Sequence, residues 1–363
     1  MAERAPDPAF LDPARRRGRG AATNRTGRFE AQAREAFDDG WDMPEALPPL
    51  RTEVALDASR SVIARNDSPD LSFDRSVNPY RGCEHGCVYC FARPSHAFLG
   101  LSPGLDFETR LTAKPDAPRL LAAELSRPGY RPAPLAIGAN TDPYQPLERR
   151  MGVMRGLLEV LRDFRHPVAV VTKGALIGRD ADILGEMGRM GLARVGVSLT
   201  TLDHRLARSM EPRAASPGRR LAAIRALADA GCPVRVVIAP VIPTLNEDEI
   251  EAILAAARDA GAVAARCIPL RLPREVAQLF RDWLAETRPD RAARVMRAVR
   301  EMHGGRDYDP EWGKRLRGEG VRAALIARRF TAACARLGLS LEQPPLRCDL
   351  FRKPAAPDQP FLL

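Results

Sequence analysis

The chain has 363 residues, 45% of them hydrophobic, and a formal net charge of +10, so it is long enough to bury a large core. The chain has seven cysteines, an odd number, and its N-terminal residues lack an apolar leader. Both observations indicate that the cysteines are free thiols or metal ligands and argue against a disulfide framework. No run of about 18 uncharged apolar residues occurs, so we expect a cytoplasmic protein without a membrane partner.

Residues 1–50 are predicted to be a mostly disordered basic arm. They are rich in Pro, Gly and Arg, include the run ARRRGRG at residues 14–20, and show no sustained hydrophobic period, which is typical of segments that cannot bury a core. Such an arm either grips phosphate groups or stays solvated, and the sequence leaves both interpretations open.

Residues 51–272 are predicted to be an α/β core. Short apolar runs alternate with longer segments of helical periodicity, and six strand–helix units can be counted. The predicted strands are 71–77, 135–138, 168–172, 194–199, 234–239 and 264–270. The clearest predicted helices are 150–165, 180–190, 218–230 and 247–260, the last opened by an Asn246 cap and an acidic first turn.

Repeated βα units require right-handed crossovers and a parallel sheet covered by helices, either as an open doubly wound sheet or as part of a barrel. Periodicity does not choose between the two. Both arrangements gather ligands at the carboxyl ends of the strands. After the core we expect a helical C-terminal extension over residues 273–348 and a loose tail over residues 349–363.

Three of the cysteines, Cys83, Cys87 and Cys90, form a C-x3-C-x2-C motif in a glycine-punctuated loop after the first predicted strand. Three soft thiolates close together favour iron–sulfur or zinc. A [4Fe-4S] cluster normally takes four cysteines, so three would leave one iron open to an exogenous chelator. Two alternatives stay open: a zinc site completed by His85 or His96, and three unrelated buried thiols.

This motif, with Tyr89 before its last cysteine, resembles the signature of the radical S-adenosylmethionine (SAM) superfamily, and the βα units resemble its partial (βα)6 barrel. The stretches NPYRGCEHGCVYCFARPSH, GLSPGLDFET, NTDPYQPLE, VTKGAL, SLTTLD, EPR and RLP are similar to an uncharacterised bacterial branch related to spore photoproduct lyase and DNA-repair photolyase-like proteins. The arm's RGRGAATN and RFE share that similarity.

The resemblance implies that Cys83, Cys87 and Cys90 ligate a [4Fe-4S] cluster whose fourth iron is chelated by SAM. One electron from a donor such as flavodoxin or ferredoxin would break a carbon–sulfur bond of SAM, giving methionine and a 5′-deoxyadenosyl radical that abstracts hydrogen from the substrate. Tyr89 would lie beside the adenine.

Cofactor contacts are also expected after the second and fourth predicted strands. By the resemblance, Thr141 and Asp142 would meet the SAM amino group; the alternative is an Asx-type turn closing onto Pro143. Ser198 is the preferred partner of the SAM ribose or carboxylate, with Thr200 beside it, although hydroxyl residues are also common at strand ends.

Three weaker expectations complete the set. Arg213 would bind a carboxylate bidentately, or instead form a structural pair with Glu211. Ile242 follows the fifth predicted strand, where the superfamily places apolar backbone against adenine. Lys173 would meet an anionic substrate or the SAM carboxylate, or snorkel to the surface.

Spore photoproduct lyase donates a hydrogen atom from a cysteine near the end of its second strand, whereas residues 137–143 contain no cysteine. Cys267, in the sixth predicted strand, is the candidate donor if its side chain faces the barrel. The alternative is a buried thiol that packs as a small hydrophobe. This departure argues against thymine-dimer repair.

We therefore expect a radical SAM enzyme with a lyase-like or transferase-like reaction. The pI of about 9.7 favours nucleic acid as the substrate, although an Arg-rich composition with only four lysines among 56 basic residues also explains it. The alternatives are radical modification of a peptide or protein, and a zinc-stabilised nucleic-acid-binding module without catalysis.

Overall fold

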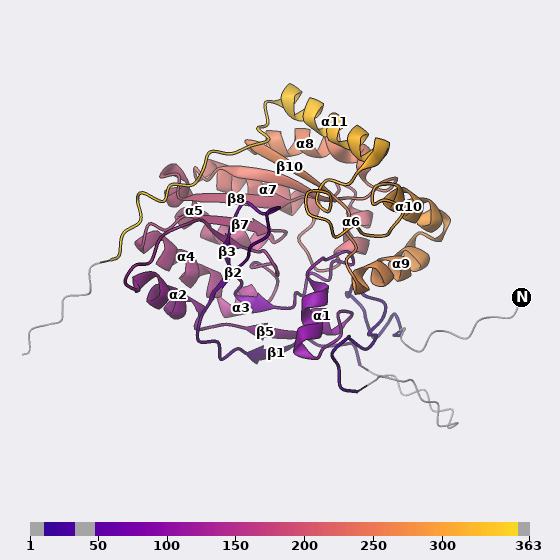
Figure 1. The fold of residues 1–363 in the computed structure, drawn as a ribbon, viewed down its shortest axis with the longest axis horizontal. Helices are drawn as coiled ribbons and strands as arrows, with labels where there is room; N and C mark the ends of the chain where they lie inside the picture. Colours follow the sequence, from indigo (N-terminus) through magenta and orange to yellow (C-terminus); the bar gives the residue numbers. More distant parts are fainter. Residues whose placement is uncertain (1–10, 33–47, 355–363) are drawn as a thin grey trace, which may run out of the picture.

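A mostly parallel sheet of seven strands forms the centre of the molecule (Figure 1). The computed structural model describes residues 11–32 and 48–354. Every strand pairing in this sheet is parallel except that of β2 with β3, and the order is β10-β9-β8-β7-β6-β3-β2. The strands are β2 (Ile63–Arg65), β3 (Arg75–Val77), β6 (Leu135–Ile137), β7 (Val168–Thr172), β8 (Ala193–Ser198), β9 (Val234–Val241) and β10 (Ala264–Pro269).

The strand order is that of a barrel which does not close. From β3 to β10 each parallel strand lies beside the next one along the chain, whereas a doubly wound sheet reverses its order at a switch point. The end strands β10 and β2 do not pair with each other. The predicted partial (βα)6 barrel is therefore confirmed, and the sheet keeps one open flank.

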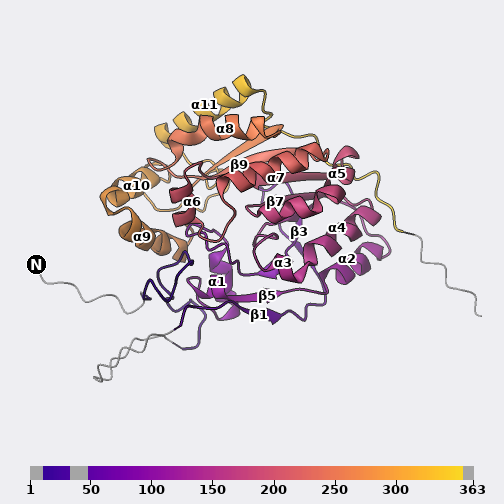
Figure 2. The same ribbon diagram turned by 180° about the vertical axis from the view of Figure 1, so that it is seen from behind.

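Helices cover the outer face of this sheet, as the two opposite views show (Figures 1 and 2). Each outer helix packs against the next one along the chain, so the layer is continuous. On α4 the buried side chains recur with helical period, which turns one apolar stripe toward the sheet. The outer helices are α2 (Ala117–Ser126), α4 (Val153–Asp163), α5 (Ala181–Arg189), α7 (Pro217–Asp229), α8 (Ile250–Asp259) and α11 (Gly320–Leu337).

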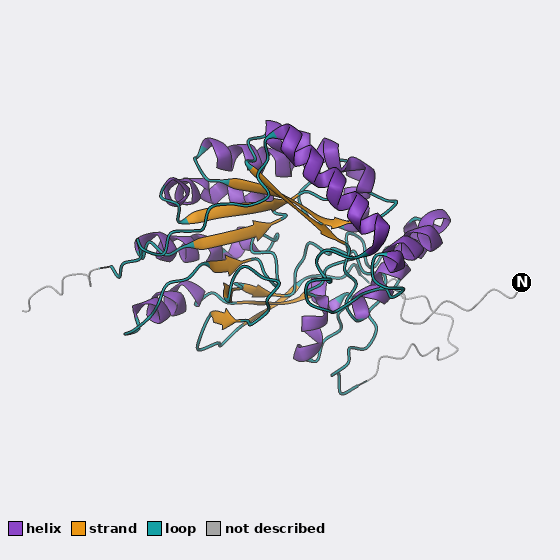
Figure 3. Ribbon diagram, turned by 45° about the horizontal axis from the view of Figure 1, so that its top comes forward, coloured by secondary structure: helices purple, strands orange, loops and turns teal. Residues whose placement is uncertain are grey.

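The parallel strands point toward a layer of loops and short elements at one end of the sheet (Figure 3). This layer contains a three-stranded sheet of β1 (Glu53–Leu56), β5 (Arg110–Ala113) and β4 (Tyr80–Arg81). The short and 3₁₀ helices are η1 (Arg93–Leu99), α1 (Asp106–Thr109), α3 (Glu148–Met151), η2 (Ala175–Asp180), α6 (His204–Met210) and η3 (Glu247–Glu249); two further helices are α9 (Glu275–Thr287) and α10 (Pro289–Glu301).

Two local predictions differ from the structure. The first predicted strand is shortened to β3 because residues 66–74 form a polar turn in which the Asn66 N–H donates to the Asp74 carbonyl and the Asn66 carboxamide accepts from Ser68. Asn246 does not cap a helix. Its side chain instead joins two strand ends, accepting from the Ile242 N–H at 2.6 Å and donating to the Thr200 carbonyl at 2.7 Å.

The described part of the arm is packed, unlike the predicted disordered arm. Ala21, Ala22 and Thr23 are buried, because the Glu108 carboxylate accepts hydrogen bonds from the N–H groups of Gly20 and Ala21 at 2.8 and 2.9 Å. Residues 1–10 and 33–47 of the arm lie outside the described ranges, as do residues 355–363 of the predicted tail. Across the described residues, no helix combines the length and apolar character needed to cross a membrane.

Candidate functional site

The cysteine loop follows β3 and is fixed by backbone contacts to two distant elements. The Cys83 N–H donates to the Phe107 carbonyl at 2.8 Å, and the Val88 N–H donates to the Met210 carbonyl at 3.0 Å. Gly82 and Gly86 adopt left-handed φ values of 74° and 68°, which glycine accepts without strain. A Cβ on Gly82 would also stand only 2.9 Å from the Phe107 carbonyl oxygen, so glycine is required there.

The three loop cysteines carry free thiols. Cys83 and Cys87 are buried and Cys90 is half-buried. Burial raises the pKa of Cys83 well above its ordinary value, and Asp142 and the other two thiols raise it further. Burial also raises the pKa of Cys87, against the opposing effect of Lys173. A bound metal centre reverses this situation, since coordination deprotonates a thiol outright.

These thiols fit an iron–sulfur cluster by their chemistry, since one loop carries three soft sulfur donors. In the described ranges, no group of three or more His, Cys, Asp or Glu side chains is gathered tightly enough to hold a single metal ion. Each histidine of the zinc alternative has one contact: His85 Nδ1 lies 3.3 Å from the Asp142 carboxylate, and His96 Nε2 lies 3.0 Å from the Arg110 carbonyl oxygen. His96 Nδ1 is buried without a hydrogen-bond partner.

Thr141 supports the cysteine loop from the end of β6. Its hydroxyl donates to the Gly82 carbonyl at 2.7 Å, and Gln145 reaches the same carbonyl at 3.3 Å. Gln145 also accepts a hydrogen bond from the Glu84 N–H at 2.8 Å. The described contacts of Thr141 are thus with the loop backbone and Gln145, whereas its contact with the SAM amino group stays a prediction.

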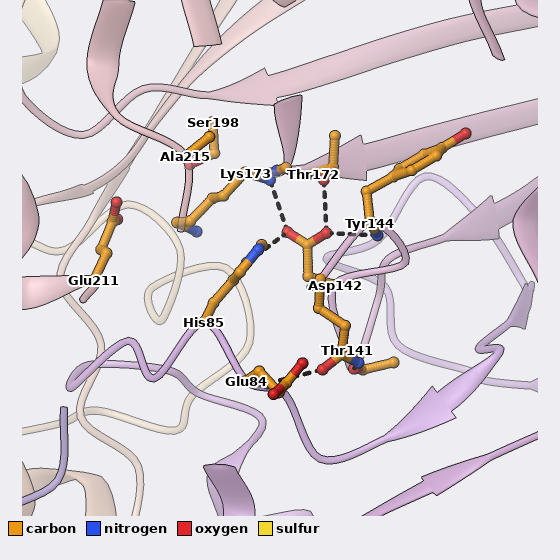
Figure 4. A network of polar contacts seen from close by, with 12 residues as sticks. Glu84, His85, Thr141, Asp142, Tyr144, Thr172, Lys173, Ser198, Glu211 and Ala215 are labelled. Carbon is orange, nitrogen blue, oxygen red and sulfur yellow. Dashed lines mark hydrogen bonds and ion pairs between the residues drawn. The ribbon is translucent and has the colours of Figure 1, made fainter. Parts of the chain in front are cut away.

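Asp142 is the centre of a network of polar contacts (Figure 4). It accepts from the Tyr144 N–H at 2.9 Å, which is the Asx-type turn that was the alternative prediction, and from Thr172 and the Lys173 N–H at 2.6 and 2.7 Å. His85 Nδ1 lies 3.3 Å away. Burial alone would raise the pKa of Asp142, but His85, Thr172 and the Lys173 N–H together hold it well below its ordinary value.

Glu211 is the centre of a second buried network. Its carboxylate accepts hydrogen bonds from the Tyr89 hydroxyl, from Thr200 at 2.6 Å and from the Arg220 guanidinium. Arg220 also donates to the Ser198 carbonyl at 3.0 Å. This network ties the aromatic residue of the cysteine loop to the end of β8, so the predicted positions Tyr89 and Ser198 share one polar cluster.

Arg213 pairs with an acid of the cysteine loop rather than with Glu211. Its guanidinium lies 3.0 Å from the Glu84 carboxylate, and Glu84 also accepts from Thr52 at 2.7 Å. Thr52 in turn accepts from Arg19 at 3.1 Å. The arm, the residue that precedes β1 and the loop that follows α6 are therefore joined through the Glu84 carboxylate.

The remaining predicted residues divide between two hydrophobic clusters. Ile242 is buried in the cluster that contains Cys87 and Tyr89, so the structure brings these three together. Cys267 packs instead against the main core. Burial, with a smaller effect of the nearby Cys334 thiol, raises the pKa of Cys267 to about 12. Lys173 Nζ lies 5.7 Å from the centroid of the Tyr89 ring.

Several site residues carried no local signal in the sequence. Arg93 is fully buried, and its guanidinium lies 2.5 Å from the Glu108 carboxylate while also donating to the Cys87 carbonyl at 2.9 Å. Arg220 lies in the first turn of α7, where the sequence shows only a helical pattern. Only the requirement that a buried carboxylate have a cationic partner could have indicated such residues, and burial of Glu108 and Glu211 is not visible in the sequence.

The open barrel with a C-x3-C-x2-C loop at its strand ends defines a class of protein. Residues 77–257 match the model of the Radical SAM superfamily, and the chain belongs to this superfamily. Its members use a [4Fe-4S] cluster and SAM.

The individual similarities are to proteins of two kinds. Uncharacterized proteins of Mycobacterium tuberculosis and Mycobacterium bovis are 36% identical over 260 residues, covering 71% of this chain and 75% of theirs. An uncharacterized protein of Methanocaldococcus jannaschii is 24% identical over 173 residues, which is 48% of this chain and 62% of that one. Spore photoproduct lyase with bound AdoMet and dinucleoside spore photoproduct is similar in fold, with a TM-score of 0.58 at 15% identity over 79% of this chain and 80% of that one.

Proposed function

We propose that Cys83, Cys87 and Cys90 ligate a [4Fe-4S] cluster with which this chain cleaves SAM reductively to start radical chemistry on a substrate. The observation that carries the proposal is the cysteine loop itself, which holds three free thiols at the strand ends of a radical SAM barrel. Bound by these three cysteines, such a cluster would supply the electron that breaks a carbon–sulfur bond of SAM.

The residues around the loop have two roles in this proposal. Thr141 and Gln145 hold the backbone that carries Cys83, while Arg93 holds the carbonyl of Cys87. The Glu211 network fixes the Tyr89 ring by its hydroxyl. Ile242 and Tyr89 supply apolar surface next to Cys87, which supports their predicted place beside the adenine.

We propose that SAM lies next to four strand-end residues and interacts with their backbone groups or their charges. These residues are Thr141, Asp142, Ser198 and Arg213. The described partners of the Asp142 and Arg213 side chains are protein groups, namely Thr172, two backbone N–H groups, His85 and Glu84. Because the Asp142 carboxylate accepts hydrogen bonds from these groups, it fixes the strand end that would face SAM. We infer that Asp142 orders the backbone of residues 172–174, since it accepts from Thr172 and from the Lys173 N–H.

We propose nucleic acid as the substrate class and a small acidic electron carrier such as flavodoxin or ferredoxin as the reductant. The net charge of +10 supports a polyanionic partner. The similar fold of spore photoproduct lyase, whose structure holds a dinucleoside spore photoproduct, points the same way. The lack of a cysteine in residues 137–143 argues for a reaction other than that lyase's own.

The test is anaerobic reconstitution with iron and sulfide, reduction with dithionite, and measurement of 5′-deoxyadenosine after addition of SAM. Cys87→Ala should lose cluster and product together, and Cys348→Ala, a cysteine outside the loop, is the matched control. Wild-type protein that takes up no iron and sulfide would refute the proposal. Zinc near one equivalent without sulfide would support the zinc-module alternative.

A further inference from the structure

An exposed aromatic ring follows the last loop cysteine directly. Phe91 is 47% exposed, although its neighbours Tyr89 and Ala92 are buried. The Arg271 guanidinium lies 4.6 Å from the centroid of the Phe91 ring, within the range of a cation–π contact. A large apolar ring exposed beside the reactive loop, backed by a cation, is a feature that the proposed SAM cleavage does not use.

The backbone at Arg271 is fixed by the residues on either side of it. It follows β10 between two buried leucines, Leu270 and Leu272, which are 2% and 1% exposed. The Leu270 N–H donates to the Val241 carbonyl at 2.9 Å, and the Leu270 carbonyl oxygen lies 2.9 Å from His303 Nε2. The backbone therefore fixes where the Arg271 side chain emerges.

The Arg271 guanidinium has no anionic partner of its own. It makes no hydrogen bond or ion pair with any residue in the described ranges, and burial lowers its pKa. Tyr308, Cys90 and the Asp70 carboxylate favour its charged form electrostatically, whereas Arg315 opposes it. The Asp70 carboxylate is already bound by Arg315 at 2.5 Å and by the Gly313 N–H at 2.7 Å. A half-buried cation without a counter-ion is costly, so an anion from outside would stabilise it.

This pair lies at the open flank of the barrel. Arg271 follows the last strand of the sheet, whereas Asp70 lies in the connection between β2 and β3, the strands at the opposite end. Phe91 follows Cys90 directly, and the Arg271 guanidinium lies 4.6 Å from its ring centroid. The pair therefore stands beside the cysteine loop, on the side of the last strand of the open sheet.

We propose that Phe91 and Arg271 form a recognition pair for one nucleotide unit of a nucleic acid, with the base stacked on the exposed ring and a phosphate bound by the guanidinium. Bases stack on aromatic rings regardless of sequence, and guanidinium groups match phosphate geometry. The proposal rests on the proposed function and specifies its substrate class.

The experiment measures binding of a short fluorescent oligothymidylate to the anaerobically reconstituted protein by anisotropy over a series of salt concentrations. Phe91→Leu keeps an apolar side chain without a ring, so it should weaken binding about tenfold at every salt concentration. Arg271→Gln removes one phosphate contact, so it should lower the slope of log K against log salt by about 0.7. Phe91→Tyr should bind as wild type does.

Arg328→Gln is the matched control, since Arg328 is exposed on α11 and should leave affinity and slope unchanged. Equal iron content and thermal unfolding show that each variant is folded. If folded Phe91→Leu or Arg271→Gln binds the oligonucleotide as wild type does, the proposed recognition pair is refuted. It is also refuted if the wild-type protein binds no oligonucleotide at low salt. If that same wild type forms 5′-deoxyadenosine, SAM cleavage stands and only the recognition pair fails.

Discussion

Gly20 of the arm lies against Gly86 of the cysteine loop, so closely that a Cβ on Gly20 would overlap the Gly86 carbonyl group. The Gly20 N–H donates to Glu108, and a Cβ on Gly86 would in turn stand 2.7 Å from the same carboxylate. The arm and the loop thus meet backbone to backbone, with Glu108 joining them. The conformation of the segment between Cys83 and Cys87 depends on this contact.

Replacing Gly20 by alanine should therefore displace the arm from the loop. We expect Gly20→Ala to lower the free energy of unfolding by about 1–3 kcal/mol, as overpacking does, and to speed loss of iron to a chelator. Gly218→Ala is the control, because nothing lies within 4 Å of a Cβ at this helical position. Chelation at the wild-type rate in Gly20→Ala would contradict the expected dependence of the loop on the arm.

The Glu211–Arg220 pair should be a strong contributor to stability. Both residues are 2% exposed, so Glu211→Gln leaves a buried guanidinium without its counter-ion, at a cost of about 3–5 kcal/mol. Urea denaturation measures the difference. Asp259→Asn removes a solvent-exposed pairing to Arg258 and should change stability by less than about 1 kcal/mol; similar losses in both variants would refute the assignment.

His166 should make the protein less stable in mild acid. Burial lowers its pKa to about 4, below the value of about 6.5 in an unfolded chain. The unfolded state therefore binds the proton first as pH falls, and stability should drop by about 2 kcal/mol between pH 7.5 and 5 through this residue. His166→Gln should have a correspondingly flatter profile, whereas His204→Gln, at an exposed position, should keep the wild-type slope.

Cys267 should be chemically inert in the folded protein. Burial raises the pKa of both Cys267 and Cys232 to about 12, so almost no thiolate is present at pH 8. Iodoacetamide should label these two residues only after unfolding, which peptide mass spectrometry can follow. Because Cys267 packs against the main core, Cys267→Ala should still form 5′-deoxyadenosine. Rapid native labelling of Cys267 would instead favour a reactive role.

Local sequence patterns were sufficient to predict the central strands of the sheet, but they did not predict that the N-terminal arm packs against the core. The predicted strands at 168–172 and 194–199 agree with β7 and β8 to within one residue, since buried parallel strands are short continuous apolar runs. The packing of the arm was not predictable, because the partner of Gly20 is Glu108, a residue distant in the sequence. A polar, glycine-rich segment is typical of disorder unless such a partner exists.

The site shows the same division. The cysteine loop was predicted because its three thiols are close in sequence, whereas the hydrogen-bond partners of Thr141, Asp142 and Arg213 depend on which distant groups the fold brings near them. Gly82, Thr172 and Glu84 take those positions. A strand-end position predicts that a polar side chain lies at the ligand-binding edge of the sheet, but it does not predict which atom that side chain contacts.

The contact between the arm and Glu108 also constrains the order in which the holoenzyme is assembled. Residues 19–21 leave the ribosome before the cysteines do, yet they cannot dock until Glu108 has been synthesised, since its carboxylate binds their N–H groups. The loop is therefore synthesised before the arm can pack against it. A cluster inserted in that interval would meet a loop whose Gly86 is not yet packed against Gly20, whereas a cluster inserted later would meet the packed form.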